Sequence, residues 1–548
     1  MSKYNYSRRL SSEVHVAGLT IGGDAPVRVQ SMTNTNTLDT EGSAMQAMRI
    51  AEAGGELVRL TTQGVAEAAN MAAIRRELHD RGCHVPLVAD VHFNPKAAYT
   101  AAASCDKVRI NPGNFVDAAR TFRRLSFTDE EYAEEIGRIR NALLPLLDIC
   151  RTHRTALRLG VNHGSLSDRI MSRYGDTPAG MVESVMEFLR ICREENFNDI
   201  VISIKASNVV VMVATVHLLV KEMTREGMAY PVHLGVTEAG DGEDGRVKSA
   251  VGIGTLLAEG IGDTIRVSLS EAPENEIPVA IALRDYISSR RNHPLITEPA
   301  SEAPYPSRSM ADDIDGIGGS TPWPMLYGFD VTPQDGHILD IDASDDVEKG
   351  AEPGKVIRLH SSHVNPVGEM ESWIERYIAA GGRNPVTLCM EYADTDADTV
   401  RLKAAADFGA MLLNGYGNAL EIKSPALDSR AAHSLLSGIL QATRLRFSKT
   451  EYIACPSCGR TLFDLPATLA QVREATSHLK GLKIGVMGCI VNGPGEMADA
   501  DYGYVGAGVG RVSLYKGKEL KIRNIPASEA LPALIAMLKE NGDWTEPE

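Results

Sequence analysis

Residues Val27–Thr61 read VRVQSMTNTNTLDTEGSAMQAMRIAEAGGELVRLT, and this stretch contains the pattern that decides the fold. A short run rich in valine is followed by an Ala- and Met-rich amphipathic segment that stops at a glycine pair, and then by a second short apolar run. Short β-prone runs that alternate with helical segments indicate parallel strands joined by right-handed helical crossovers. The stretch therefore predicts a strand, a helix and the next strand of an α/β protein.

The same unit recurs through the first part of the chain. Eight apolar runs share this character: Val27–Met32, Glu56–Thr61, Val85–Asp90, Asp106–Asn111, Ala156–Val161, Asp199–Lys205, Pro231–Val236 and Asp263–Ser268. Eight strand–helix units in about 250 residues are typical of a (β/α)8 barrel. An open, doubly wound sheet is the alternative, but no glycine-rich dinucleotide fingerprint follows the first run. We expect residues 1–290 to form a TIM-type barrel.

In such a barrel, reactive groups gather at the C-terminal ends of the strands. Five of these ends carry a cation: Arg59, Arg109, Arg158, Lys205 and Arg266. The same ends also carry Asp90, His92, Asn162, Thr237, Glu238 and Ser268. Guanidinium forks match phosphate oxygens, so converging cations predict a phosphate or diphosphate site. Solvated charges are the alternative for any one residue, and Glu238 is either an acid/base group or the partner of an arginine.

Glycines in Lys248–Leu257 predict a further element of this site, a helix start whose free N–H groups hold an anion. A plain glycine turn explains them equally well.

Composition narrows the class of protein. With 548 residues the chain is too long for one core, and its apolar content of 43% is that of a globular protein. A formal net charge of −16 argues against broad nucleic-acid binding. The N-terminus has no apolar signal region, and no window of ~18 apolar residues suits a membrane span. We expect a cytoplasmic protein without a membrane or nucleic-acid partner.

The alternation of strand-like and helix-like segments ends near residue 291. A Pro-, Ser- and Gly-rich stretch leads into Asp312–Glu352, which holds eleven acidic residues against Lys349 as its one cation. Lys355–Ser362 then predicts a strand and Met370–Gly382 a helix. We expect residues 291–445 to form an inserted α/β domain with a packing or spacing role.

Residues 446–548 carry clustered cysteines, at Cys455, Cys458 and Cys489. Two thiolates three residues apart can turn onto one metal centre, and this spacing is a metal-binding signal. A structural zinc site needs a fourth soft ligand, which the Cys489 loop lacks. Three thiolates suit a [4Fe–4S] cluster with one iron held differently. Glu496 is the nearest carboxylate to Cys489, but spacing alone leaves the fourth ligand open.

At these residues the sequence resembles a known family. CPSCGRT (455–461) and GCIVNGPGE (488–496) are similar to the iron–sulfur domain of 4-hydroxy-3-methylbut-2-enyl diphosphate synthases, the IspG/GcpE family. The barrel agrees through VQSMTNT, ADVHF, VRINPGN, GVNHGSL, SIKAS, GVTEAG and GIGDTIRVSL. The middle segment resembles the inserted domain of the longer forms, although it is compact for one.

The resemblance implies an activity and a set of roles. The family reductively opens 2-C-methyl-D-erythritol 2,4-cyclodiphosphate and removes water, yielding an isoprenoid precursor, with flavodoxin or ferredoxin as electron donor. By this resemblance Glu238 is the acid/base group. The implied cluster ligands are Cys455, Cys458, Cys489 and Glu496. The implied substrate-binding residues are Arg59, Arg109, Arg158, Asn162, Lys205, Thr237, Arg266 and Ser268.

Some alternatives stay open at this point. In two-domain relatives the cluster domain covers the barrel of a second subunit, whereas an insert could let one chain close on itself, so the sequence predicts either a monomer or a homodimer. A pterin-type methyltransferase barrel with a zinc knuckle explains the barrel and CPSCG but leaves Glu496 without a role. A non-catalytic scaffold that docks through the acidic insert leaves the strand-end cations unexplained.

Overall fold

The structure, a computed structural model, describes residues 3–116, 126–300, 310–490, 495, 497 and 499–547. Its contacts divide the chain into two compact units. We call the first the insert unit, made of Met1–Arg9, Arg246–Ile261 and Ala282–Ser448. We call the second the barrel unit, made of Leu10–Gly245, Gly262–Ile281 and Lys449–Glu548.

An eight-stranded parallel barrel forms the centre of the barrel unit. Its strands are β3 (Arg28–Met32), β4 (Leu57–Thr62), β5 (Leu87–Val91), β6 (Lys107–Ile110), β7 (Ala156–Asn162), β8 (Ile200–Lys205), β9 (His233–Leu234) and β10 (Thr264–Ile265). They are ordered β8-β7-β6-β5-β4-β3-β10-β9, and a parallel bridge between Ile202 and Val232 closes the ring. All eight predicted strands are present, so the TIM-type barrel is confirmed.

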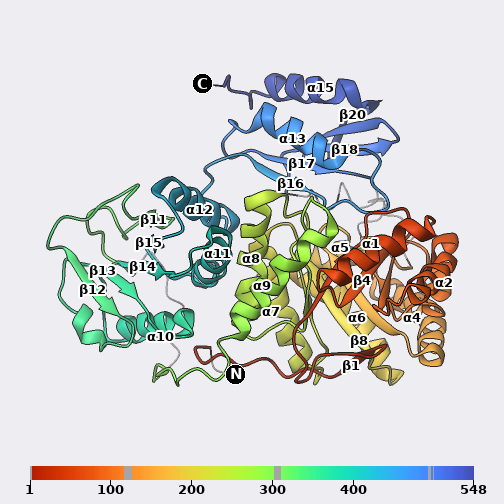
Figure 1. Cartoon of the computed structure of the whole chain (residues 1–548), viewed down its shortest axis with the longest axis horizontal. Helices are drawn as coiled ribbons and strands as arrows, with labels where there is room; N and C mark the ends of the chain where they lie inside the picture. Colours follow the sequence, from red (N-terminus) through yellow and green to blue (C-terminus); the bar gives the residue numbers. More distant parts are fainter. Residues whose placement is uncertain are drawn as a thin grey trace. The chain divides into compact units, whose positions relative to one another are not determined.

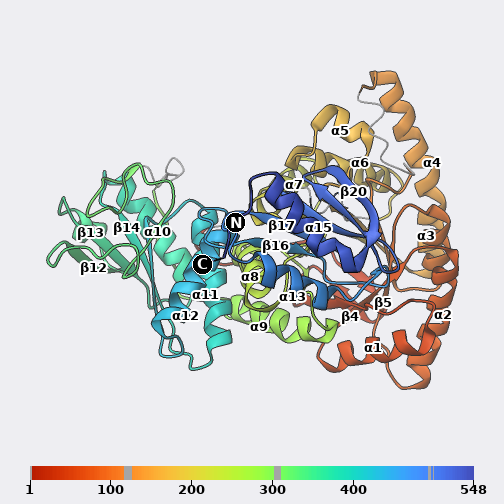
Figure 2. The same cartoon turned by 90° about the horizontal axis from the view of Figure 1, so that it is seen from above.

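Helices α1 to α7 surround these strands (Figures 1 and 2). Their bounds are α1 (Thr40–Glu52), α2 (Val65–Asp80), α3 (Pro95–Ala102), α4 (Asp129–His153), α5 (Asp168–Tyr174), α6 (Pro178–Glu194) and α7 (Val209–Arg225). Side-chain caps fix several starts. The Asp39 carboxylate accepts the Gly42 N–H at α1, and Thr128 forms a capping box with Glu131 at α4. Capping satisfies N–H groups that have no partner inside the helix.

The N-terminal end of the barrel is closed by a hairpin. Strands β1 (Val14–Val16) and β2 (Leu19–Ile21) pair antiparallel. Their side chains Val14, Val16 and Ile21 are buried against residues at the N-terminal ends of barrel strands, including Leu57. Burial of this apolar layer stabilises the closed end, so access to the barrel interior is left to the C-terminal strand ends.

The insert unit contains a second parallel sheet, ordered β11-β15-β14-β13-β12. Its strands are β11 (Met325–Leu326), β12 (Ile338–Asp342), β13 (Val356–His360), β14 (Val386–Glu391) and β15 (Ala419–Lys423). Its helices are α10 (Pro366–Ala379), α11 (Ala397–Leu413) and α12 (Ser429–Ala442), with a short 3-10 turn, η3 (Val347–Gly350). Helix α10 begins earlier than its sequence pattern predicts because Asn365 accepts the Gly368 N–H as an N-cap.

One prediction is wrong. Helix α8 spans Gly242–Ala258, so Lys248–Leu257 lies inside a helix and not at its start. Gly254 has a packing role instead, since a Cβ atom there would lie 2.7 Å from the Cβ of Ala406 on α11. Small residues let the two helices approach closely within the insert unit. The barrel sequence continues after α8 with β10, the turn η1 (Pro273–Asn275) and α9 (Glu276–Ser288).

The C-terminal segment of the barrel unit has a mixed sheet, ordered β16-β17-β18-β19-β20. Its elements are β16 (Glu451–Ala454), α13 (Leu465–Thr476), β17 (Lys483–Met487), β18 (Tyr502–Gly508), β19 (Arg511–Lys516), β20 (Glu519–Pro526) and α15 (Ala527–Glu540). The first three strands are parallel and the last three antiparallel. Both cartoon views place this sheet over one end of the barrel (Figures 1 and 2).

Across the described ranges, no helix is both long and apolar enough to cross a membrane.

Gly254→Ala is expected to destabilise the protein by about 1–3 kcal/mol, because the added methyl group overlaps Ala406. Gly137→Ala, inside α4 with nothing within 4 Å of the added carbon, is the matched control. The control should gain about 0.5–1 kcal/mol from helix propensity. Chemical denaturation of both variants measures the difference, and equal stability would contradict the packing role of Gly254.

Candidate active site

The C-terminal ends of the barrel strands and the cysteine-bearing segment line one cavity of about 760 Å³, open solvent included. Every barrel residue predicted from the sequence lines it: Arg59, Arg109, Arg158, Asn162, Lys205, Thr237, Glu238, Arg266 and Ser268. Cys455, Cys458 and Cys489 line the same cavity. Glu496, the remaining predicted residue, lies outside the described residues.

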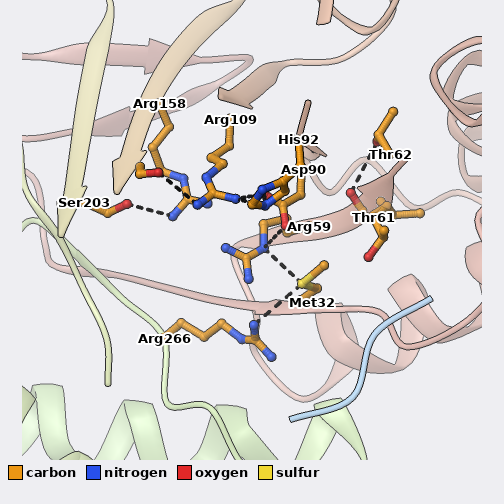
Figure 3. Close-up of polar contacts among 12 residues, drawn as sticks. Met32, Arg59, Thr61, Thr62, Asp90, His92, Arg109, Arg158, Ser203 and Arg266 are labelled. Atoms are coloured by element: carbon orange, nitrogen blue, oxygen red, sulfur yellow. Dashed lines mark hydrogen bonds and ion pairs between the residues drawn. The ribbon is translucent and has the colours of Figure 1, made fainter. Parts of the chain in front are cut away.

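Strand register sets the cations side by side. Asp90 on β5 pairs with Arg109 on β6, and Arg109 pairs with Arg158 on β7. Parallel neighbours in register present their side chains on the same face, here the barrel interior. Figure 3 shows Arg59, Arg109 and Arg158, from β4, β6 and β7, turned toward a common space.

Asp90 holds three of the cations. Its Oδ1 lies 2.8 Å from Arg109 Nη1, and its Oδ2 lies 3.9 Å from Arg59 Nε and 3.5 Å from Arg460 Nη2. Burial by itself would raise the pKa of Asp90, but Arg109 and Arg59 hold it well below its usual range. The carboxylate is therefore ionised at neutral pH and fixes the guanidinium groups around it.

His92 is the neutral neighbour of this group. Burial and the charge of Arg109 both lower its pKa well below the usual value. Its Nε2 is within hydrogen-bond distance of Arg109 Nη1, and its Nδ1 lies 3.2 Å from Asn114 Nδ2. An uncharged imidazole can accept from Arg109 through Nε2 without adding charge to a cationic site.

Arg266 has a carboxylate partner of its own. Its Nε and Nη2 each lie 2.9 Å from a different oxygen of Glu276, a bidentate pair. Ser31 Oγ donates to the same carboxylate at 2.6 Å. Met32 Sδ lies between Arg59 and Arg266, at 3.1 Å from Arg59 Nε and 3.7 Å from Arg266 Nη1 (Figure 3). These contacts orient Arg266 before any ligand enters.

Arg158 keeps donors available. It is 1% exposed, and its Nη1 donates to Ser203 Oγ at 3.2 Å. Its Nε and Nη2 are buried and have no hydrogen-bond partner among the described residues. Burial and the neighbouring Arg59 lower its pKa, and burial, Arg59 and Arg158 lower that of Lys205. Buried cationic donors without partners are costly, and a bound anion would satisfy them.

The lining as a whole has an excess of cations. Within the part of the chain that the structure describes, it holds six Arg or Lys side chains and two carboxylates, Asp90 and Glu238. Burial lowers the pKa of Arg59 to about 10; Asp90 opposes this shift, and the charges of Arg266 and Arg109 add to it. The cavity therefore favours a ligand with more than one negative charge.

Glu238 enters the cavity from a strained backbone position. It follows β9, is 3% exposed and has a φ of 49°, in the left-handed region that non-glycine residues rarely adopt. The Thr237 N–H donates to the Ala206 carbonyl at 3.1 Å, which ties this loop to the segment after β8. Strained residues held by their surroundings are common at functional sites.

The cysteines are delivered by two adjacent strands. Cys455 follows β16 and Cys489 follows β17, and these strands pair in parallel through Ala454 and Val486. The Gly488 N–H donates to Cys455 Sγ at 3.3 Å. Ser457 has a φ of 60°, and the Cys458 N–H donates to Thr461 Oγ1 at 3.0 Å, so the Cys-Pro-Ser-Cys turn is a defined structure.

Among the described residues, no three His, Cys, Asp or Glu side chains converge as ligands of a single metal ion. The three thiols instead border a shared cavity.

Backbone and ion-pair contacts join the cysteine segment to the barrel of the same chain. Ala239 and Ala454 form a parallel bridge, and Ser270 Oγ donates to the Cys455 carbonyl at 3.0 Å. Further out, Arg473 pairs with Asp241, and Lys449 Nζ lies 2.5 Å from Asp244. One polypeptide therefore supplies both halves of the cavity.

Sequence reasoning assigned no role to three of the lining residues. Asp90 and His92 stand at a strand end, and a carboxylate among arginines is a recognisable signal. Arg460 comes from the cysteine segment, two residues after Cys458, and reaches Asp90 in the barrel. The motif CPSCGRT shows that this position is an arginine. It does not show that the arginine contacts Asp90, because Asp90 lies 370 residues away in the sequence.

The chain is similar to known proteins along nearly its whole length. The GcpE TIM-barrel domain family matches residues 11–281, and the GcpE protein C-terminal domain family matches residues 451–540. A 4-hydroxy-3-methylbut-2-en-1-yl diphosphate synthase (flavodoxin) of Parabacteroides distasonis is 51% identical over 99% of this chain and 100% of that protein. The protein of the same name from Phocaeicola vulgatus is 52% identical over 100% of both chains.

Among solved structures, a sialic acid synthetase from Leptospira borgpetersenii aligns with a TM-score of 0.34 and 11% identity over 54% of this chain and 95% of that chain. That likeness is too weak to support a conclusion. The relatives match from end to end, and their two domain families cover the two segments that line the cavity. The chain therefore belongs to the 4-hydroxy-3-methylbut-2-en-1-yl diphosphate synthase family.

Proposed function

We propose that this chain converts 2-C-methyl-D-erythritol 2,4-cyclodiphosphate to 4-hydroxy-3-methylbut-2-enyl diphosphate, a precursor of isoprenoids. The reaction opens a C–O bond of the ring, consumes two electrons and two protons, and releases one water molecule. The observation that carries this proposal is the single cavity in which barrel cations and the cysteines of the C-terminal segment meet. The name of the relatives agrees with it.

The cations bind the diphosphate. Arg59, Arg109, Arg158, Lys205 and Arg266 come from five different strands and surround the phosphate oxygens from several sides. Arg158 contributes its buried Nε and Nη2, which have no hydrogen-bond partner among the described residues. Asp90 and Glu276 hold the other arginines in place, so little side-chain ordering is needed when the substrate arrives. Arg460 adds a cation from the cysteine segment.

Glu238 is the proton donor or acceptor of the reaction. It borders the cavity, is 3% exposed and is held at a strained backbone position, whereas Asp90 is committed to three arginines. A buried carboxyl group next to the reacting carbons can deliver the proton that converts a departing hydroxyl group to water. Asn162, Thr237 and Ser268 line the same cavity and orient the sugar-derived part of the substrate.

The cysteines fit an iron–sulfur cluster. Cys455, Cys458 and Cys489 all border the cavity, and the N–H group of Gly488 is directed at one sulfur, as N–H groups commonly are around cluster thiolates. In a [4Fe–4S] cluster each thiolate binds a different iron, so the sulfurs need not converge on one point. When bound, such a cluster supplies low-potential single electrons. The family resemblance assigns the fourth position to Glu496.

The electrons come from flavodoxin, the donor that the name of the relatives includes, with ferredoxin as the second candidate. We further propose that three domains carry these tasks: a barrel at 1–290, an insert at 291–445 and a cluster domain at 446–548. The insert positions the others. Because one chain completes the cavity, catalysis needs no second subunit, and a homodimer would join complete sites.

A structural zinc site is the rival reading of the cysteines. The protein purified without oxygen is expected to be brown and to hold about four irons per chain. Cys489→Ser should lose most of the iron, since one of three thiolates is missing. Cys83→Ser, at a partly buried cysteine outside the cavity, is the control and should keep it. A colourless wild-type protein with one zinc would contradict the proposed function.

Arg158→Met is expected to weaken substrate binding by about 10- to 100-fold, because a charge-assisted contact of about 1.5–3 kcal/mol is lost. Iron content should not change, since Arg158 lies on β7 and not in the cysteine segment. Arg138→Met, on a 64% exposed side chain of α4, is the control. Calorimetric titration of the anaerobic enzyme with the cyclodiphosphate measures both, and wild-type affinity in Arg158→Met would refute this role.

Glu238→Gln is expected to lower kcat by about 10²- to 10⁴-fold, as removal of a general acid does. The amide keeps the size of the side chain, so substrate affinity should stay within a few-fold of wild type. Steady-state kinetics with a small-molecule reductant, combined with calorimetry, separates the two effects. Full turnover of Glu238→Gln would remove Glu238 from the mechanism.

A further inference from the structure

The edge of the C-terminal sheet concentrates positive charge in an acidic protein. The chain has a formal net charge of −16, yet residues 511–523 hold five cations and one carboxylate. Four of these cations are exposed, and we call them the basic edge: Arg511, Lys518, Lys521 and Arg523. They lie on or beside β19 and β20, and β20 is the outermost strand.

The basic edge extends to the sheet face that carries the cysteines. Ile522 and Ile525 of β20 pack against the core that includes Leu534 of α15, on one face of the sheet. The opposite face contains Met487 and Tyr515, with Cys455 packed against them. Neighbouring residues on a strand point to opposite faces of the sheet, so Arg523, directly after Ile522, points to that opposite face.

Exposed apolar side chains lie at the same end of the sheet. A Cβ atom on Gly506 would lie 2.4 Å from the Gly488 carbonyl oxygen, so the β18–β19 hairpin contacts the residue before Cys489. Ile490, directly after Cys489, is 55% exposed, and Val509 at the hairpin turn is 87% exposed. An exposed apolar spot with a charged rim is a feature of binding surfaces.

The two ends of the basic edge both lie near the segment that carries Cys489. Arg511 lies at the hairpin, where it contacts Asn524, the neighbour of Arg523. Lys518, in the β19–β20 turn, lies 3.6 Å from Asp176 of the barrel. Asp176 accepts the N–H of Gly164, and a Cβ atom on Gly164 would overlap the carbonyl oxygen of Gly495.

Protection of an edge strand does not account for all of this charge. Exposed edges are often blunted by lysines or by β-bulges. The β19–β20 pairing already has two register shifts, between Val512 and Leu514 and between Leu514 and Tyr515. Bulges of this kind prevent edge-to-edge pairing without any cation. The cations therefore need a further explanation.

We propose that the basic edge, together with the exposed side chains of Ile490 and Val509, is the docking surface for an acidic one-electron carrier protein. The inference rests on the proposed function, which needs electrons delivered at the cysteine segment. Complementary charge steers such a partner and raises the rate of encounter, and electron-transfer contacts are small and short-lived. Small apolar contacts then bring the carrier close to Cys489.

The test reverses charge at the edge without touching the cavity. In Lys521→Glu/Arg523→Glu, the KM for flavodoxin and its calorimetric Kd are expected to rise by about 10-fold or more at low salt. Turnover with dithionite and methyl viologen should be unchanged, because a small reductant needs no docking surface. Raising the salt concentration should weaken flavodoxin binding to the wild type and have little effect on the variant.

A matched control reverses charge elsewhere. Arg138→Glu/Arg225→Glu changes the net charge equally, on 64% and 63% exposed side chains of α4 and α7. An equal loss of flavodoxin affinity in this control, or wild-type affinity in the edge variant, would overturn the proposal. If the edge variant lost iron, the neutral variant Lys521→Gln/Arg523→Gln would replace it in the same assays. Its affinity for flavodoxin is expected to fall a few-fold, and wild-type affinity would refute the proposal.

Failure of the proposed function gives a different result. A wild-type protein without turnover under either reductant would contradict the activity. The calorimetric Kd of flavodoxin needs no turnover and would still test the docking surface. Binding to the wild type that is abolished by charge reversal at the basic edge would support the docking surface. No binding of flavodoxin to the wild type would refute it.

Discussion

The site depends on one carboxylate. Asp90 is buried among cations and stays ionised because Arg109 and Arg59 hold its pKa down, and in return it keeps their guanidinium groups from repelling one another. Arg460 reaches the same carboxylate from the cysteine segment. A single negative charge thus organises the anion site and joins it to the loop that carries Cys455 and Cys458. Without that charge, repulsion would separate the buried guanidinium groups in the absence of substrate.

The barrel makes this arrangement possible through its register. Parallel strands place Asp90, Arg109 and Arg158 side by side on the inner face, and the β1–β2 hairpin fills the opposite end with apolar side chains. The cavity can therefore open only where the strands end. Cationic donors such as those of Arg158 stay buried and without hydrogen-bond partners among the described residues, a cost that the fold tolerates and that an anionic substrate would relieve.

Regions of the chain with different proposed roles carry charge of different sign. The acidic insert segment, the cation-rich cavity and the basic edge of β20 lie within one polypeptide of net charge −16. A protein whose overall charge repels anions can still bind a diphosphate and an acidic partner, because local fields depend on nearby charges and are screened within about 10 Å. The insert has its own sheet and core, and its contact through Gly254 and Ala406 shows how small residues let two of its helices approach closely.

The sequence by itself determined the barrel, all eight strands, the strand-end cations and the cysteine pattern, because hydrophobic periodicity and residue type are local properties. Resemblance to the family added the roles, including that of Glu496, which lies outside the described residues. Local pattern misread Lys248–Leu257, since glycines within a helix and at its start look alike until the neighbouring helix is known. Only the tertiary structure decided that the cysteine segment closes over the barrel of its own chain and that Asp90 pairs with Arg460. These facts depend on residues hundreds of positions apart, and no local pattern encodes which distant partner a buried charge will meet.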